Sequence, residues 1–390
     1  MRRMKIKDNL IIKLILGVII GILVGIYSNE SVIQIIITIK QILGQVIFYM
    51  VPLIIVGFIT PAITDLKENA SKMLFAALAI AYLSSVGAAL FSMISGYAII
   101  PQLNIMPETE GIRHLPELVF LLEIPALMPV MTALFTAIVF GLAIIWTNAE
   151  GFEKLFKELN NMLMQMVRRI IIPILPIFIA TTFAGLAYEG EIISQFPVFL
   201  KVILIVIVGH FIWLALLYAI AGAIAKKNPL EVVKYYGPAY FTALGTMSSA
   251  ATLPVSLTCA RKSPVLDRKI ADFAVPIGAT IHLCGSVLTE VFFVMTVSQI
   301  LYGKLPEVGS MIIFIILLGI FAIGAPGIPG GTVMASLGLI TGVLLFDQTG
   351  VALMLTIFAL QDSFGTACNI TGDGAIALML TGLFGEKEKA

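Results

Sequence analysis

The chain has 390 residues, of which 59% are hydrophobic and only 12% are charged. A soluble domain is closer to half apolar and one quarter charged, so this composition excludes a soluble globular fold and predicts a polytopic membrane protein. The net charge of +1, with no basic stripe, gives no indication of a nucleic-acid partner, and three cysteines without CxxC spacing indicate neither a disulfide framework nor a metal site.

The positively charged residues 1–7 precede an apolar run without a small-residue cleavage site, so we expect a retained first helix and a cytoplasmic N-terminus. A membrane-spanning helix needs about 20 mostly apolar residues. Six such spans are expected, over 10–27, 33–64, 73–100, 119–146, 162–186 and 196–225. The second contains Pro52 and is long enough to tilt or kink, and the fourth is broken at Pro125 and Pro129.

Beyond residue 229 the pattern changes to four segments rich in glycine, small residues and intramembrane polar groups, over 232–260, 273–301, 311–346 and 353–383. We expect these segments to break at 245–254, 276–280, 324–331 and 369–374. Broken backbone at membrane depth is tolerated where it is buried in protein or lines a cavity, and paired interruptions indicate a transporter binding site. The alternative is ordinary close packing of glycine-rich helices. Four breaks, each with hydroxyls or prolines, favour the binding site.

The last segment carries Asp362, Thr366, Asn369 and Asp373, whose spacing places them on one face of a helix. Carboxylates deep in an apolar segment are costly and persist where they bind something. A carboxylate, an amide oxygen and nearby carbonyls suit a hard cation such as Na⁺, and a second carboxylate suits a substrate ammonium group. The alternative is a structural polar network.

In the second segment, His282, Ser286 and Glu290 are spaced four apart and share a face. Burial of Glu290 favours its neutral form, which makes it a candidate proton carrier; the alternative is a hydrogen-bonded glutamic acid without a role in transport. His282 is a cation-site neighbour, a pH-sensitive group or a core histidine. His114 and His210 have no supporting pattern.

Both interrupted hairpins can present backbone N–H groups at a helix N-terminus, where anions bind. A substrate α-carboxylate fits there. Ser248 and Ser249 on one tip supply hydroxyls, and residues 327–331 on the other supply permissive backbone.

Four motifs resemble those of the dicarboxylate/amino acid:cation symporters, the glutamate-transporter family. They are residues 246–254 (first hairpin tip), 276–281 (seventh helix), 324–331 (second hairpin tip) and 369–373 (eighth helix). The resemblance covers nearly the whole chain. It implies an all-α fold of eight transmembrane helices and two re-entrant helical hairpins, arranged as inverted repeats in an elevator-type homotrimer in the plasma or inner membrane.

The resemblance also implies domains: scaffold helices over 1–70 and 118–190, and a mobile transport domain from 71–101 and 195–390. Asp362 would hold the substrate amino group, and Asp373 one sodium ion. The implied substrate-binding set is Ser248, Ser249, Ser286, Ile328 (through its backbone), Asp362, Gly365, Thr366 and Asn369. The implied sodium set is Gly278 (through its carbonyl), Thr280, His282, Asn369 and Asp373. No cofactor is expected beyond Na⁺ as coupling ion.

The chain departs from the family at residues 282–286, which read His-Leu-Cys-Gly-Ser where the family has Asn-Met-Asp-Gly-Thr. Cys284 therefore replaces the aspartate of a third sodium site, although the presumed hydroxyl partners Ser84 and Ser85 remain. We expect that site to be lost or weakened.

A second departure concerns the arginine that serves the side-chain carboxylate in acidic-substrate members, because Gly365 and Met247 occupy its positions. Without that bidentate partner, a small neutral substrate such as serine, threonine or alanine is expected. Residues 360–363 are similar to the family's serine/threonine transporters, and Glu290 matches the glutamate of proton-linked members. The alternative is an acidic amino acid or dicarboxylate carrier in which a hairpin dipole or Arg261 replaces the arginine.

The same residues allow two other classes of function, an intramembrane protease and a channel. An intramembrane aspartyl protease needs two carboxylates about 3 Å apart, whereas Asp362 and Asp373 lie roughly 16 Å apart on one helix. A channel would show flux without saturation or coupling. We therefore expect a transporter and not an enzyme.

Overall fold

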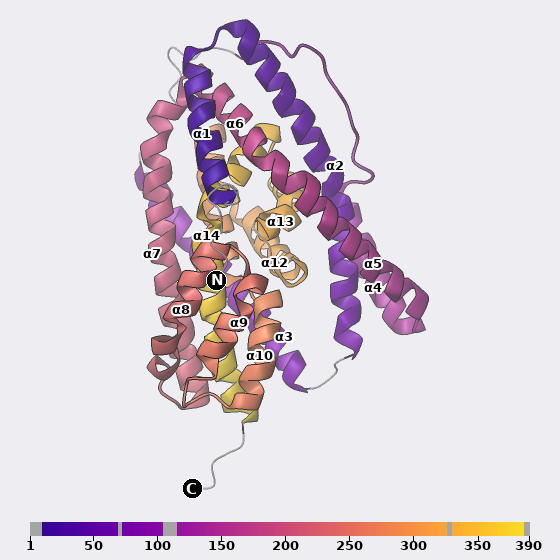
Figure 1. Cartoon of the computed structure of the whole chain (residues 1–390), viewed down its shortest axis with the longest axis vertical. Helices are drawn as coiled ribbons and strands as arrows, with labels where there is room; N and C mark the ends of the chain where they lie inside the picture. The colour runs from indigo at the N-terminus through magenta and orange to yellow at the C-terminus, as the bar shows by residue number, and fades with distance from the viewer. Residues whose placement is uncertain (1–9, 69–71, 104–114, 326–329, 386–390) are drawn as a thin grey trace.

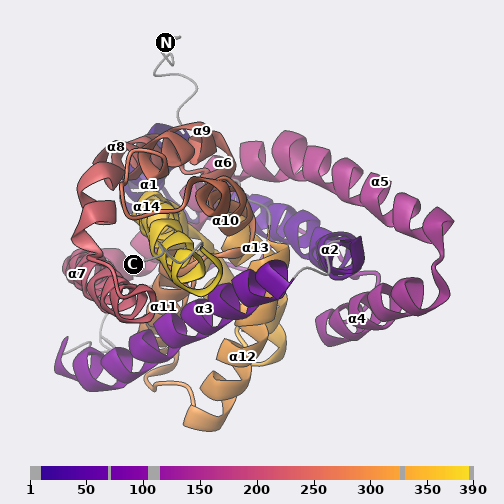
Figure 2. The same cartoon turned by 90° about the horizontal axis from the view of Figure 1, so that it is seen from below.

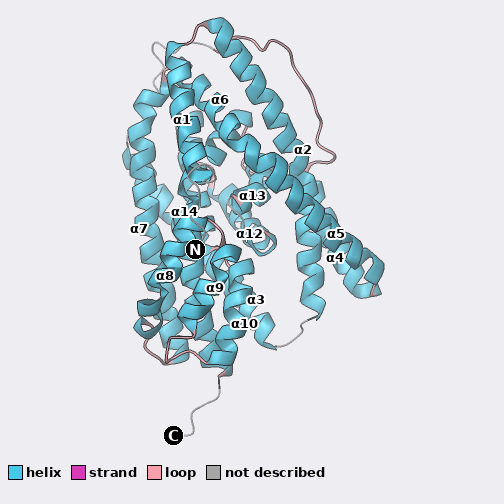
Figure 3. Cartoon of the chain, viewed as in Figure 1, coloured by secondary structure: helices cyan, strands magenta, loops and turns pink. Residues whose placement is uncertain are grey.

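The structure is a computed structural model that describes residues 10–68, 72–103, 115–325 and 330–385. All regular structure in these ranges is helical (Figure 3). The prediction of an all-α protein is therefore confirmed for the part of the chain that the structure describes.

The first half of the chain contains long helices and two short turns: α1 (Leu10–Tyr27), α2 (Glu30–Glu68), α3 (Lys72–Ile99), the 3₁₀ turn η2 (Ile100–Leu103), α4 (Val130–Thr147), α5 (Glu150–Met166), the π turn η3 (Val167–Ile171), α6 (Ile172–Glu189) and α7 (Glu191–Ala225). The π turn continues α5 into α6, so that residues 150–189 form one uninterrupted helical stretch.

Shorter helices dominate the second half: α8 (Leu230–Thr246), α9 (Ser249–Ala260), α10 (Arg268–Ile281), α11 (Cys284–Tyr302), α12 (Val308–Gly324), α13 (Gly331–Gly342) and the long α14 (Gln348–Phe384). Helices α8 and α9 pack against each other as a hairpin, and so do α12 and α13. Only Met247 and Ser248 separate α8 from α9. The expected interruptions at the two hairpin tips are thus present.

The helices pack in two groups. Helices α1, α2, α4, α5 and α6 contact one another, and α4 and α5 project to one side (Figures 1 and 2). Helix α14 lies among α7, α8, α10 and α11, and it is buried along nearly its whole length. The division of the chain into a scaffold and a transport domain, and the movement of one against the other, stay predictions.

Six helical stretches among the described residues are long and apolar enough to cross a membrane, namely 30–61, 72–103, 150–189, 198–225, 268–302 and 348–384. The chain is therefore a multi-pass membrane protein. Helices α1 and α4 have 18 residues each, close to the lower limit for a bilayer, so the count of eight spans stays a prediction.

The expected break at 369–374 is wrong, because α14 continues through it. Its glycines serve close packing instead. A Cβ at Gly374 would lie 2.4 Å from Tyr218 Oη, and one at Gly372 would lie 2.7 Å from His282 Cε1. The absence of a side chain lets α7 and the end of α10 approach α14 without interrupting its hydrogen bonds.

The second break is displaced. The sequence indicated 276–280, but α10 runs through Pro276 and ends at Ile281, so the interruption lies at His282 and Leu283. A proline removes one backbone hydrogen bond of a helix, and here that loss does not end α10. The helix ends where α14 supplies a cap for the next helix, as described below.

Two boundaries in the first half also differ from expectation. Residues 119–129 are not helical, and α4 starts after Pro129 because that ring cannot continue a helix toward the N-terminus. The span expected from Met162 begins at Glu150, since α5 has charged residues on one face and apolar residues on the other. A search for unbroken apolar runs misses such a helix.

Replacement of Gly374 by alanine is expected to lower stability, because the new methyl group would overlap Tyr218 and Tyr236. Overpacking of this kind costs about 1–3 kcal/mol. The melting temperature of the detergent-solubilised protein measures it. The control is Gly237→Ala on α8, where a Cβ meets no atom within 4 Å. Equal melting temperatures for the two variants would contradict the packing argument.

Candidate functional site

The polar face of α14 contacts three elements in turn along its length. Asp362 reaches the first residues of α13, Asn369 reaches the first turn of α11, and Asp373 reaches His282 between α10 and α11. The one-face spacing read from the sequence therefore describes side chains that lie inside the protein, each at the end of another helix.

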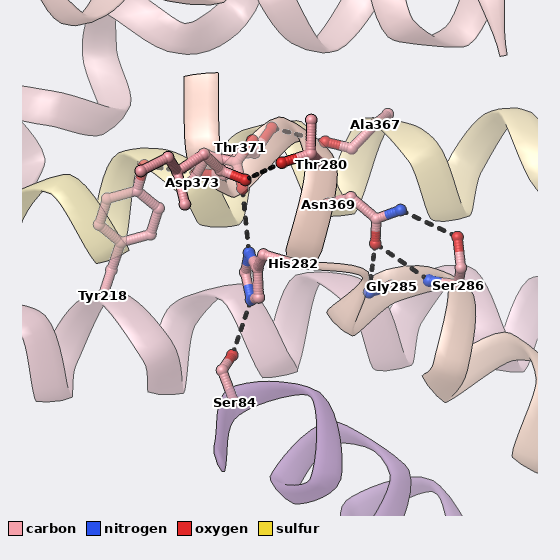
Figure 4. A network of polar contacts seen from close by, with 11 residues as sticks. Ser84, Tyr218, Thr280, His282, Gly285, Ser286, Ala367, Asn369, Thr371 and Asp373 are labelled. Carbon is pink, nitrogen blue, oxygen red and sulfur yellow. Dashed lines mark hydrogen bonds and ion pairs between the residues drawn. The ribbon is translucent and has the colours of Figure 1, made fainter. Parts of the chain in front are cut away.

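Asn369 caps α11. Its Oδ1 accepts the N–H groups of Gly285 at 2.8 Å and Ser286 at 3.1 Å, and its Nδ2 donates to Ser286 Oγ at 2.9 Å (Figure 4). The first N–H groups of a helix have no partner inside that helix, and no water reaches this buried position. The amide of Asn369 thus allows α11 to begin inside the protein.

His282 bridges two helices. Its Nδ1 lies 3.1 Å from Asp373 Oδ1, and its Nε2 lies 2.9 Å from Ser84 Oγ on α3 (Figure 4). With Asp373 ionised, Nδ1 would donate to its carboxylate and Nε2 would accept the Ser84 hydroxyl, because an ionised carboxylate only accepts hydrogen bonds. Of the three interpretations of His282, the structure favours a hydrogen-bonded neighbour of Asp373.

Asp373 retains one unused oxygen. Its Oδ2 is buried and has no hydrogen-bond partner, while Oδ1 is held by His282. Gly278 lies against the same carboxylate, because a Cβ there would be 2.7 Å from Oδ1. A buried carboxylate oxygen without a protein partner is costly, and a small hard cation would satisfy it.

Asp362 stands at the other end of the polar face. Its Oδ2 accepts the N–H of Gly330 at 2.6 Å, where Gly330 adopts φ +71° at the N-terminus of α13. The carboxylate is 4% exposed. Asp362 and Asp373 bind different elements along one unbroken helix, so they cannot face each other as a protease dyad.

The tip of the first hairpin is held by its own hydrogen bonds. Ser248 Oγ accepts the N–H of Ala251 at 3.3 Å and so caps α9, and Thr246 Oγ1 lies 2.8 Å from Thr252 Oγ1. Ser249 is the first residue of α9 and is buried. The free N–H groups at this N-terminus provide one place for an anion.

Other predicted residues contribute less to the described site. The hydroxyl of Thr280 donates to the Ile277 carbonyl at 2.7 Å on an exposed part of α10. Thr366 is buried one turn from Asp362. Ile328 lies outside the described residues, as does most of the second hairpin tip.

Glu290 lies fully buried on α11. One carboxyl oxygen, Oε1, is hydrogen-bonded to Ser336 Oγ on α13, and the other, Oε2, has no partner. Burial in this apolar setting agrees with the sequence prediction, and the contact with α13 was not foreseen.

His210 is a residue that sequence reasoning missed. Its Nε2 lies 3.0 Å from the Gly285 carbonyl and 2.9 Å from Thr289 Oγ1, so α7 is tied to the turn that Asn369 caps. The available signal was a histidine inside an apolar span, where polar side chains find partners within the protein. Its partner on α11, about 75 positions away, has no signature in the sequence.

Among the described residues, no three histidine, cysteine, aspartate or glutamate side chains gather as a metal cluster. A cation here would therefore rely on mixed oxygen ligands: one carboxylate, backbone carbonyls and hydroxyls. This donor set suits Na⁺ better than Zn²⁺.

The sequence model of the Sodium:dicarboxylate symporter family matches residues 10–383. Excitatory amino acid transporter 3 of Mus musculus is 31% identical over 255 residues, which cover 63% of this chain and 47% of that relative. Excitatory amino acid transporter 2 of Rattus norvegicus is 29% identical over 249 residues (60% and 41%), and excitatory amino acid transporter 1 of Homo sapiens is 29% identical over 236 residues (58% and 42%). The matched region spans less than half the length of these relatives.

The variant Asp373→Asn is expected to weaken sodium binding without unfolding the protein, since the amide keeps the shape but removes the charge of the unpartnered oxygen. Sodium-dependent stabilisation in detergent measures this, because a bound ion raises the melting temperature. The half-maximal sodium concentration should rise about tenfold or more, equivalent to about 1.4 kcal/mol. The control Asp347→Asn changes the exposed cap of the same helix. An unchanged sodium response in Asp373→Asn would remove this carboxylate from the ion site.

Proposed function

The chain belongs to the sodium:dicarboxylate symporter family, and from this premise we propose that it imports a small neutral amino acid of the serine, threonine or alanine class by symport with Na⁺. The family consists of transporters, so the protein is a multi-pass membrane transporter and not an enzyme. The proposal concerns the substrate, its contacts and the coupling.

The packing around Gly365 carries the neutral-substrate proposal. A Cβ on this residue would lie 3.3 Å from Ser286 Cα and 3.4 Å from Ser286 N and Oγ. A side chain at this position would require α11 to shift by a few tenths of an ångström. A substrate carboxylate beyond the α-carboxylate would therefore be buried without an arginine partner, which is strongly unfavourable.

The cation considered as a substitute is already paired. Arg261 Nε lies 2.6 Å from Asp272 Oδ1 at the end of α9, and both side chains are more than one third exposed. Met247, the other position at which an arginine would serve an acidic substrate, is apolar and 4% exposed. Both observations support a substrate without a side-chain charge.

In the proposed binding mode, Asp362 attracts the substrate ammonium group, and the N-terminus of α9 with Ser249 receives the α-carboxylate. Thr366 and the backbone of Ile328 complete the contacts, as the resemblance implies. Asp373 Oδ2, with the Gly278 carbonyl, holds one sodium ion. Because Asn369 already binds the first turn of α11, its oxygen links substrate and ion sites by holding that turn in place.

A second ion would use Thr280 and carbonyls of the second hairpin. We propose that the third sodium position of the family is lost here. Cys284 is a fully buried thiol, and the ring of His282 fills the space between Ser84 and Asp373. A thiol is a poor ligand for a hard cation.

Glu290 is the proposed proton carrier, which would give mixed sodium and proton coupling. Its carboxyl is buried, with Oε1 bonded to Ser336 and Oε2 without a partner. Assembly as a homotrimer in the cell membrane, with elevator-like movement of the transport domain, is proposed from the family alone.

Acidic amino acid or dicarboxylate symport is the second candidate. It is favoured by the description of the family and by the names of the relatives, which are excitatory amino acid transporters.

Uptake into proteoliposomes separates the two candidates. Labelled serine and labelled aspartate are offered separately, each with and without an inward sodium gradient. Sodium-driven serine uptake with little aspartate uptake is the expected result, because Gly365 and Met247 occupy the positions of the family's arginine and Arg261 is paired with Asp272. Aspartate uptake in preference to serine would overturn the neutral-substrate proposal, and uptake indifferent to sodium would overturn sodium coupling.

The variant Glu290→Gln tests the proton carrier. The amide cannot exchange a proton, so serine uptake is expected to lose most of its dependence on pH while sodium dependence persists. The measurement is initial uptake rate across a pH series. Glu307→Gln, which alters an exposed glutamate before α12, is the matched control. Retention of the wild-type pH profile in Glu290→Gln would assign proton coupling elsewhere.

A further inference from the structure

Gln361 is a buried amide that the site described above does not use. Its side chain is fully buried on α14, and neither Oε1 nor Nε2 has a hydrogen-bond partner. A buried amide without hydrogen bonds costs several kcal/mol in the absence of compensation, so native proteins rarely keep one without a reason. This side chain stands next to Asp362, the proposed ligand of the substrate amino group.

The packing of α11 on α14 indicates what Gln361 faces. Gly365 lies against Ser286, and Gly372 lies against Cys284, so later residues of α14 pack against earlier residues of α11 and the two helices are antiparallel. One turn from the Gly365–Ser286 contact, α14 presents Gln361 and α11 presents Glu290. The two residues therefore occupy matching positions on packed helices.

Glu290 has a free oxygen at this place. Its Oε2 is buried and without a partner, and its Oε1 is bonded to Ser336. Three buried polar side chains thus come from three packed helices, and three of their atoms are unsatisfied: Glu290 Oε2, Gln361 Oε1 and Gln361 Nε2. We call Glu290, Ser336 and Gln361 the buried triad.

Ser336 has a single hydroxyl proton but two acceptors within hydrogen-bond distance. It lies within hydrogen-bond distance of Glu290 Oε1 and also 3.1 Å from the Val333 carbonyl. A protonated Glu290 can donate from Oε1 to Ser336, which then donates to Val333, and only the uncharged oxygen Oε2 is left without a donor. When Glu290 is ionised, its Oε1 accepts the hydrogen bond from the Ser336 hydroxyl, and its Oε2 has no donor. The ionised state therefore needs another donor.

Helix α13 is held at two points by carboxyl groups. Gly330 N–H donates to Asp362, and Ser336 bonds Glu290 six residues later, about 9 Å further along the helix. A shift of α13 away from α14 would break both contacts together. The occupancy of the Asp362 site and the hydrogen bonding of Glu290 are thereby linked through one rigid element.

We propose that Gln361 is the alternative partner of Glu290 and the positioning residue of its proton step. When Ser336 withdraws with α13, the Gln361 amide donates to the Glu290 carboxylate, directly or through one water molecule, and stabilises the ionised form. The inference rests on the proposed role of Glu290 in proton coupling. It adds the residue that makes proton release depend on the position of α13.

The surroundings contain few competing charges. The helices α12 and α13 carry no titratable side chain, and α3 carries no acidic residue or histidine. Helix α7 carries His210, which reaches α11 through Thr289, and α14 carries Asp362, Cys368 and Asp373. None of these has a hydrogen bond to Glu290 among the described contacts. Gln361 lies on α14 one turn from the Gly365–Ser286 contact and has a free amide donor.

A double-variant cycle tests the proposal with Gln361→Met, Glu290→Gln and both together. Methionine keeps the length of the side chain but removes the amide. Loss of the donor disfavours the ionised carboxylate, so the pH midpoint of serine uptake should rise by about one unit, a tenfold change in proton affinity. In the Glu290→Gln background, Gln361→Met should cause no further shift. The control is Thr356→Val, a buried polar-to-apolar change on the same helix whose hydroxyl bonds only its own helix.

A second readout needs no substrate. The melting temperature of the detergent-solubilised protein is measured across a pH series for the same four proteins. Dependence of the Gln361→Met effect on pH, and its loss in the Glu290→Gln background, would support the pairing even if serine is not transported. An effect of Gln361→Met that is independent of pH and additive with Glu290→Gln would overturn it and reduce Gln361 to a packing residue. Failure of serine uptake in the wild-type protein would count against the proposed substrate alone.

Discussion

The site depends on one capping interaction, the amide of Asn369 with the first turn of α11. A helix that begins inside an apolar protein leaves N–H groups that water cannot satisfy, and only a side chain from a neighbouring element can accept them. With that cap in place, the chain can break at His282 and Leu283. The break turns the imidazole toward Asp373 and Ser84, and the restarted helix carries Glu290 to its contact with α13.

The buried acidic groups share a physical logic. Asp373 and Glu290 each use one oxygen with the protein, with His282 and Ser336 respectively, and Asp362 accepts the N–H of Gly330. Oδ2 of Asp373 and Oε2 of Glu290 are left without a partner. Stable buried charges require complete partners, so a chain that leaves carboxyl oxygens unsatisfied has room for transported cations or protons. A cation or proton that satisfied these oxygens would therefore bind favourably.

Glycine has two separate functions in the second half of the chain. At Gly330, φ of +71° starts α13 in a conformation that other residues adopt rarely. At Gly365, Gly372 and Gly374, the backbone is helical and the missing side chain admits Ser286, His282 and two tyrosines. Composition alone cannot separate these cases, which is why residues 369–374 were expected to break and instead form part of a continuous helix.

The sequence by itself determined the membrane setting, the helical class, the two hairpins and the shared face of Asp362, Asn369 and Asp373, because these follow from hydropathy, from helix-breaking residues and from the 3.6-residue period. Only the tertiary structure decided that α14 is continuous, that His282 bridges Ser84 and Asp373, and that His210 bonds the first turn of α11. These features depend on contacts between helices that are distant in the chain. Such contacts arise from side-chain packing and hydrogen-bond partners, and neither has a local periodicity to read.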